Sequence, residues 1–169
     1  LGAIAMTVLR GLVGFTFFHL AFWLRSQDQG TLWFAAVVGV SALAPMFGNA
    51  VASMLRARVR EETMLTTALL VCAGAGLLVS VLGGPLGAVV LAGVLNLMAA
   101  LGRLNFESIV QRDAPDANQG RAFAVFETRF QLAWAIGAFI AVALQVSGSI
   151  GFLIVGGVAV AASVHLFTR

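Results

Sequence analysis

Residues 64–110 read MLTTALLVCAGAGLLVSVLGGPLGAVVLAGVLNLMAALGRLNFESIV, and this stretch decides the fold. It holds two continuous apolar runs, 64–82 and 85–110, which only Gly83 and Gly84 separate. Each run is close to the ~20 residues that carry an α-helix across a ~30 Å hydrocarbon core. A β-barrel is excluded because its strands need segments of about ten residues with alternating polarity. The stretch therefore predicts two transmembrane helices joined by a tight turn.

Four further apolar runs extend this pattern toward both ends of the chain: 1–24, 31–55, 122–146 and 150–167. No polar domain or long linker interrupts the series. Because the gaps are short, we expect consecutive helices to be antiparallel neighbours. The sequence thus predicts an all-α membrane protein, with residues 1–169 forming one domain of six transmembrane helices.

Arginines concentrate in every second gap between the apolar runs. The second and fourth gaps contain or adjoin six of them: Arg56, Arg58, Arg60, Arg103, Arg112 and Arg121. The first gap has only Arg25 beside Asp28, and the third and fifth gaps carry no charge. Basic residues in short loops stay on the cytoplasmic side of a membrane. We therefore expect the second and fourth gaps, and both ends of the chain, to face the cytoplasm.

The composition excludes several classes of protein. Only 10% of the residues are charged and 60% are hydrophobic, whereas soluble domains average about 25% charged residues. The net charge of +3 comes without a basic stripe and interleaved aromatic residues, so we expect no nucleic-acid partner. Cys72 is the only cysteine, so neither a disulfide framework nor a cysteine metal cluster is predicted.

Four charged residues of the fourth and fifth runs are the first candidate site: Arg103, Glu107, Glu127 and Arg129. Arg103 and Glu107 are four residues apart and share a helix face. A hairpin centred near Asp116 brings all four residues to one depth, so we expect an ion-pair network between the two helices. Such a network acts as a static clamp or as an inner gate whose pairs break and reform, and the two roles are not exclusive. Since each deep acid lies near an arginine, which favours its ionised form, acid catalysis has no support. We expect no enzyme activity and no cofactor or metal.

A second set of polar residues is expected to line a cavity or relay protons: Arg10, His19, Asn96 and Gln131. Arg10 lies inside the first helix if that helix starts at the beginning of the chain, and it snorkels to the headgroups if the helix starts near Gly11; we favour snorkelling. His19 is flanked by Phe17, Phe18 and Phe22, which favours a packed histidine over a proton relay. Pro45 should kink the second helix.

Small residues recur every four positions in three of the runs. The stripes are Ala133, Gly137 and Ala141; Ala88, Ala92 and Asn96; and Gly157 and Ala161. Small residues allow the close backbone approach that drives helix association in lipid. We expect these stripes to be either static packing seams or interfaces along which helices slide.

Two loop segments and one helix resemble the major facilitator superfamily of transporters. Residues 48–62, with the basic run Arg56, Arg58 and Arg60, are similar to its loop between helices eight and nine, and 115–123 to its loop between helices ten and eleven. Residues 126–137 resemble helix eleven of drug-exporter-like bacterial members. The first segment lacks the Asp of the fuller motif, which points to the carboxy-terminal half. The motif positions are Gly48, Arg56, Arg58, Arg60, Pro115, Gly120 and Arg121.

This resemblance implies the following architecture and activity. The chain would supply helices seven to twelve of a twelve-helix fold, built as a 3+3 inverted repeat, in a bacterial inner membrane. With the missing six-helix half of the same chain it would export a small amphipathic compound by proton-coupled alternating access. The rival hypothesis is a non-transporting half-domain that anchors a partner or a fused enzyme. The first residue is Leu1, and we interpret the chain as part of something longer. The sequence does not predict the substrate.

Overall fold

A computed structural model describes residues 2–55, 58–113 and 119–168. In these ranges it contains six α-helices and one short 3₁₀ helix, and no strand: α1 (Gly2–Trp23), η1 (Leu24–Ser26), α2 (Gly30–Leu55), α3 (Glu61–Leu82), α4 (Gly84–Asp113), α5 (Gln119–Leu144) and α6 (Gly148–Phe167). All six α-helices are long and apolar enough to cross a membrane. The predicted all-α class and the predicted six helices of membrane-spanning length are confirmed within these ranges. The predicted bounds were too short where a helix continues into polar residues, as α3 does by starting at Glu61 instead of residue 64.

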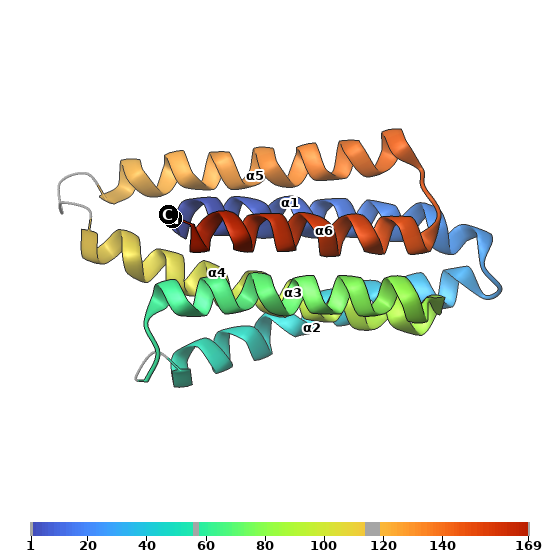
Figure 1. The fold of residues 1–169 in the computed structure, drawn as a ribbon, viewed down its shortest axis with the longest axis horizontal. Coiled ribbons are helices and arrows are strands. Elements are labelled where there is room, and N and C mark those ends of the chain that lie inside the picture. Colours follow the sequence, from blue (N-terminus) through green and yellow to red (C-terminus); the bar gives the residue numbers. More distant parts are fainter. Residues whose placement is uncertain (1, 56–57, 114–118, 169) are drawn as a thin grey trace.

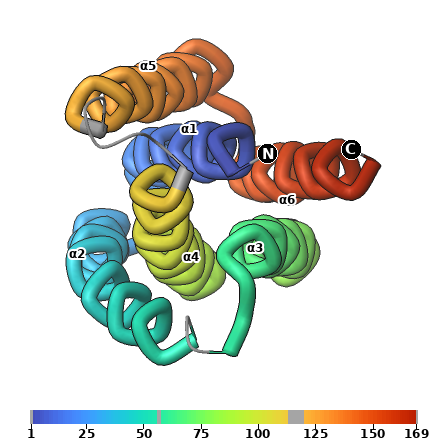
Figure 2. Tube along the Cα trace, turned by 90° about the vertical axis from the view of Figure 1, so that its left-hand side faces the viewer, coloured from blue at the N-terminus to red at the C-terminus, as the bar shows by residue number. Residues whose placement is uncertain are grey.

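The six α-helices run along one axis and alternate in direction (Figure 1). The α2–α3 and α4–α5 connections lie at one end, and Figure 2 shows both chain termini at that end. This end carries Arg58, Arg60, Arg112 and Arg121, and we call it the arginine-rich end. At the opposite end Gly83, with φ of 67°, and Gly84, with φ of 78°, form the tight turn between α3 and α4. Only glycine adopts such angles without strain.

Packing between the helices does not follow chain order. The most extensive contacts join α1 to α5, α2 to α4 and α3 to α6, followed by α3–α4, α1–α4 and α1–α6. Within the described residues, α1–α2, α2–α3 and α5–α6 make marginal contact at most, and α4–α5 makes little. The expectation that consecutive helices are antiparallel neighbours was therefore confirmed for α3–α4, confirmed only in part for α4–α5, and wrong for α1–α2, α2–α3 and α5–α6, which are antiparallel but do not pack together in the described ranges. A short connection fixes only the helix ends, and side-chain packing decides which helix lies alongside.

Glycines mark the closest approaches between helices. A Cβ on Gly137 of α5 would collide with the carbonyl oxygen of Gly11 and lie 3.0 Å from the backbone nitrogen of Phe15, both in α1. Ala141 is buried on the same face, so this predicted stripe is confirmed as an interhelical contact. In α6 the predicted residues Gly157 and Ala161 are exposed. Gly156 packs there instead, because a Cβ on Gly76 of α3 would lie 2.6 Å from its nitrogen.

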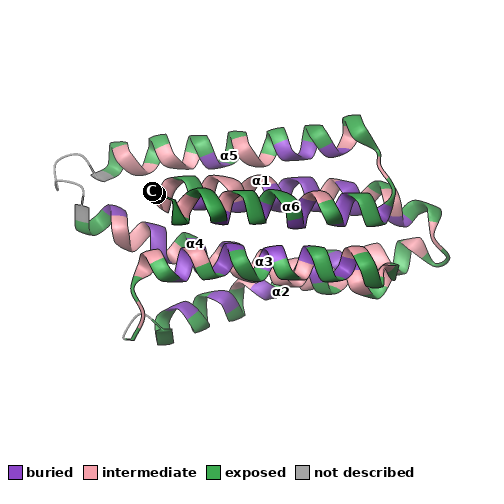
Figure 3. Cartoon of the chain, in the orientation of Figure 1, coloured by how far each residue is buried: buried purple, intermediate pink, exposed green. Residues whose placement is uncertain are grey.

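Burial is uneven among the helices (Figure 3). The buried share of the apolar span is largest in α1 and smallest in α2 and α5. Many large apolar side chains of α2 and α5 are exposed, including Leu32, Met46, Phe47, Leu132, Ile136 and Phe139. Helices that are apolar all round suit a lipid environment. α1 is therefore the most enclosed helix, and α2 and α5 lie at the outside of the described bundle.

Candidate functional site

A polar cavity of about 380 Å³ lies between α1, α2 and α4. Its lining combines charged, amide and small apolar side chains: Arg10, Val13, Pro45, Asn49, Asn96, Ala99, Ala100, Arg103, Leu104 and Glu107. Arg10 and Asn96 were predicted to line a cavity, and both do. Asn49 and Pro45 were not among the predicted site residues. A cavity with two arginines, a glutamate and two asparagines can bind polar or charged groups within a helix bundle that is otherwise apolar.

The local sequence explains how these groups reach the cavity. α1 begins at Gly2, so Arg10 lies about 12 Å inside the helix at ~1.5 Å per residue. This favours the interior placement of Arg10 and goes against the snorkelling that we favoured from the sequence. Pro45 has no N–H to donate to the carbonyl of Ser41. Near this missing hydrogen bond, Nδ2 of Asn96 in α4 donates to Ser41 Oγ at 3.1 Å. It also donates to Ala92 O of its own helix at 2.9 Å.

Three of the four predicted network residues, together with Gln131, form a continuous chain of contacts. Arg103 Nε donates to Glu107 Oε1 at 2.9 Å, and Arg103 Nη2 lies 3.8 Å from Glu127 Oε2 across the α4–α5 interface. Gln131 Nε2 donates to Glu127 Oε1 at 2.7 Å. We call Arg103, Glu107, Glu127 and Gln131 the inner ion-pair chain. The three charged side chains are between 32% and 53% exposed in the chain alone, so this face is open.

Arg129 does not take part, contrary to the predicted network. Its side chain is exposed and makes no ion pair with any residue that the structure describes. The expectation compared depths along the helix and ignored direction around it. Residues two apart in an α-helix point about 200° apart, whereas residues four apart share a face. Glu127 therefore aligns with Gln131 and not with Arg129.

Aromatic rings complete the α4–α5 contact. Phe106 of α4 lies 4.9 Å from Phe126 and 5.1 Å from Phe130 of α5 between ring centroids, in edge-to-face geometry. A second cavity, of about 270 Å³, lies between these rings and the inner ion-pair chain. α4 and α5 are therefore joined by side chains around open space, and not by close backbone packing.

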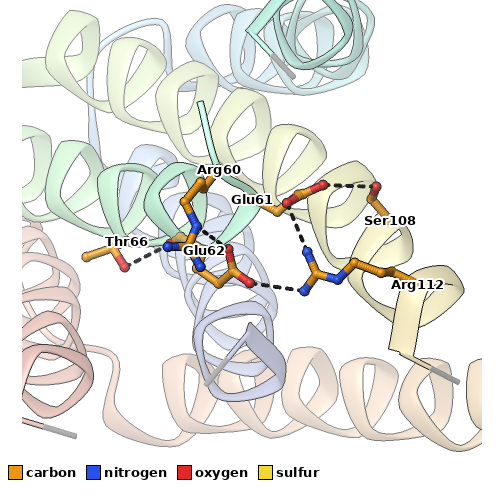
Figure 4. A network of polar contacts seen from close by, with 6 residues as sticks. All are labelled: Arg60, Glu61, Glu62, Thr66, Ser108 and Arg112. Carbon is orange, nitrogen blue, oxygen red and sulfur yellow. Dashed lines mark hydrogen bonds and ion pairs between the residues drawn. The ribbon is translucent and has the colours of Figure 1, made fainter. Parts of the chain in front are cut away.

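Figure 4 shows a polar network that the sequence analysis missed. Arg112 of α4 lies 3.4 Å from Glu61 Oε2 and 3.1 Å from Glu62 Oε1, both of α3. Ser108 Oγ donates to Glu61 Oε1 at 3.3 Å, and Arg60 Nε lies 3.7 Å from Glu62 Oε2. We call these five residues the α3–α4 clamp. The sequence pattern that could have indicated this clamp is the pair Ser108 and Arg112, because residues four apart share a helix face.

The predicted loop-motif residues fall in different places. Gly48 lies inside α2 and is buried, because a Cβ there would lie 2.5 Å from the carbonyl oxygen of Leu97 in α4; its assignment to the cytoplasmic loop was wrong. Arg58 and Arg60 lie in the α2–α3 connection, while Gly120 and Arg121 begin α5. Arg56 and Pro115 lie outside the described residues.

His19 is buried away from the first cavity and lines a separate cavity of about 380 Å³ with Trp23 and Gln145, as its predicted cavity-lining role requires. Its ring stacks on Phe15 with centroids 5.7 Å apart and meets Phe152 of α6 edge-on. Nε2 has no hydrogen-bond partner in the described residues. This packing agrees with the favoured interpretation of a packed histidine.

No protein-family model and no curated protein sequence matches this chain. The superfamily resemblance therefore rests on the residues quoted above.

Proposed function

We propose that the chain is the carboxy-terminal half of a secondary active transporter of the major facilitator type, in a bacterial inner membrane. The observation that carries this proposal is the open polar face of the bundle. The cavity and the inner ion-pair chain belong to helices whose other exposed side chains are largely apolar. Charges that face lipid are strongly unfavourable, and those within spans face a cavity or a protein partner. A second six-helix half would cover this face and enclose a water-filled site.

The pattern of helix contacts supports a 3+3 repeat. Exchanging α1 with α4, α2 with α5 and α3 with α6 converts the α1–α5 contact into α2–α4, and α1–α6 into α3–α4. The same exchange leaves α3–α6 and α1–α4 unchanged. All six extensive contacts thus follow one internal symmetry. Internal repeats of this kind underlie transporter folds in which one unit rocks against another around a central site.

In the proposed cycle the inner ion-pair chain forms part of an inner gate. Arg103 links Glu107 of its own helix to Glu127 of α5. Separation of α4 from α5 would break the Arg103–Glu127 pair and leave the Arg103–Glu107 pair intact. The transported compound would be small and amphipathic, exported against proton entry.

The alternative is a membrane anchor without transport activity. An anchor needs helices that pack and face lipid, and it has no need of charged groups lining a cavity about 9–15 Å from the helix ends at ~1.5 Å per residue. The arrangement of Arg10, Asn49 and Arg103 around one cavity therefore favours transport.

The experiment measures water access to Asn49 from each side of the membrane. Asn49→Cys, in the full-length protein with Cys72→Ala, is labelled with an impermeant thiol reagent in intact spheroplasts and in inverted vesicles. Alternating access predicts labelling from both sides. Phe47→Cys is the matched control, since Phe47 is 64% exposed on the apolar surface of the same helix and should remain unlabelled.

Two further positions calibrate sidedness. Arg58→Cys should react only in inverted vesicles, and Gln27→Cys only in spheroplasts. If position 49 is labelled from neither side of the membrane while these two controls react, alternating access at this cavity is ruled out. The anchor hypothesis predicts that result.

A further inference from the structure

An apolar groove of about 270 Å³ separates α2 from α3 near the arginine-rich end. α4 forms its floor, and only one of its lining side chains, Thr67, is polar. The walls and floor include Val51 and Leu55 of α2, Thr67 and Val71 of α3, and Met98 and Leu101 of α4. The groove is distinct from the polar cavity, which lies on the other side of α2 and α4.

The shape of the groove follows from the helix packing. α2 and α3 make marginal contact at most, although each packs extensively on α4. Val51 and Val71 are 37% and 40% exposed on the two walls, while Leu101 is buried below them. From Met64 to Val71 the groove follows α3 for about 10 Å at ~1.5 Å per residue. This length is about two thirds of one ~15 Å leaflet of the hydrocarbon core, which suits an acyl chain.

Two basic residues stand next to a groove-lining residue in the chain. Val59 lines the groove and stands between Arg58 and Arg60 in the chain. The carbonyl of Leu55 accepts hydrogen bonds from the backbone N–H groups of Arg58 and Val59, each at 2.9 Å, and so fixes these residues at the end of α2. The side chain of Arg60 is 84% exposed, and Arg58 is exposed. The apolar groove is thus next to two exposed cations, of which Arg60 also lies 3.7 Å from Glu62 Oε2.

We propose that this groove binds one acyl chain of an anionic phospholipid, with the lipid phosphate at Arg58 and Arg60. Basic pockets between transmembrane helices on the cytoplasmic side select anionic headgroups, and arginine binds phosphate through paired N–H donors. The exposed apolar surface of α3 around Leu78 and Val81 lies toward the end without this basic cluster. The proposal does not depend on transport.

Native mass spectrometry of the full-length protein tests this proposal. The protein is released from detergent with equimolar phosphatidylglycerol and phosphatidylcholine of identical acyl chains. We expect preferential retention of phosphatidylglycerol. Arg58→Gln should reduce that preference about five-fold, since one arginine near the surface contributes ~1 kcal/mol toward anionic lipid. Arg121→Gln removes an exposed arginine from the α4–α5 side of the same end and should keep the wild-type preference.

Filling the groove separates acyl binding from headgroup binding. Val71→Trp and Thr67→Trp each place a large side chain in the groove from an exposed wall of α3, and both should abolish retention of either lipid. Leu78→Trp is the matched control on the lipid-facing surface of α3, where Leu78 is 59% exposed, and it should bind lipid as the wild type does. Circular dichroism identifies a groove-filling variant that fails to fold. The test then rests on the groove-filling variant that does fold.

Two results would overturn the proposal. One is equal retention of both phospholipids by the wild-type protein, which would show that the arginines select no headgroup. The other is wild-type retention of phosphatidylglycerol by a folded groove-filling variant, which would place the lipid elsewhere.

Discussion

α5 packs against α1 in one way and against α4 in another. Toward α1 the contact is backbone to backbone, with Gly137 and Gly14 so close to the opposite helix that neither has space for a Cβ. Toward α4 the contact consists of side chains alone, namely the Phe106 ring cluster and the 3.8 Å pair of Arg103 with Glu127. A cavity occupies the remaining space between α4 and α5.

This difference indicates which joint can open. Close-packed interfaces have one low-energy arrangement and resist gradual deformation, so α1 and α5 should move as one unit. Ion pairs between partly exposed side chains contribute only about 0–1 kcal/mol and separate easily. The α4–α5 joint is therefore where the bundle can change shape. The α3–α4 clamp is a third case, because there ion pairs accompany extensive helix packing.

The largest expected effect is on the α1–α5 joint. Gly137→Leu should force α5 away from α1, because a side chain there meets the carbonyl oxygen of Gly11. Overpacking of this kind costs about 3 kcal/mol or more, which lowers the melting temperature of a chain this long by about 6–12 °C. The measurement is thermal unfolding of the purified full-length protein.

Gly157→Leu is the control for this substitution. A Cβ on Gly157 meets nothing within 4 Å, so the same change on α6 should shift the melting temperature little. Similar melting temperatures for the two variants would contradict the description of the α1–α5 joint as a rigid seam.

The number, order and approximate bounds of the helices could be predicted from the sequence because apolar runs of membrane-spanning length carry that information directly. Gly137 could also be predicted, since small residues at four-residue spacing identify a contact face. The four-residue rule failed at Gly157, where Gly156 carries the contact instead. In a helix that is apolar all round, spacing alone does not indicate which of several stripes faces a neighbour.

For the candidate site, the sequence predicted how deep each side chain lies along its helix. It did not predict in which direction each side chain points around the helix. Arg103, Glu107 and Glu127 were placed at one level, and the structure brings them into contact. Arg129 was placed with them although it points the other way. The α3–α4 clamp was missed because helix partners are set by packing across the bundle, which no local pattern encodes. These charges are partly exposed in this chain, so the loss of one partner is less costly than it would be for a buried pair.

The next effect, of intermediate size, concerns the α3–α4 clamp. Arg112→Gln removes the one arginine that contacts both Glu61 and Glu62 and leaves these adjacent acids with only Ser108 and Arg60 as partners within the clamp. We expect a loss of about 1 kcal/mol, or about 2–4 °C in melting temperature, because helix packing still holds α3 to α4. Arg60→Gln is the control, since its 3.7 Å contact is with one acid and its side chain is 84% exposed. An equal loss in both variants would mean that Arg112 has no special role in joining the helices.

The smallest effect on stability should come from Glu127→Gln, which breaks the ion pair across the α4–α5 joint. Glu127 is 43% exposed and Arg103 keeps Glu107 at 2.9 Å, so we expect a loss below about 0.5 kcal/mol, or under about 2 °C.

The effect on conformation should be larger. The distance between the two helices is measured by pulsed electron paramagnetic resonance. The spin labels are attached at Gln111→Cys of α4 and Ala124→Cys of α5 in a Cys72→Ala background. Glu127→Gln should shift the distribution toward longer distances, because the Phe106 cluster alone then holds the joint. Arg129→Gln removes a nearby charge outside the inner ion-pair chain and should change neither stability nor distance. A large loss of stability in Glu127→Gln with an unchanged distance distribution would mean that the pair is a static clamp, and the α4–α5 joint would then be no more able to open than the α1–α5 joint.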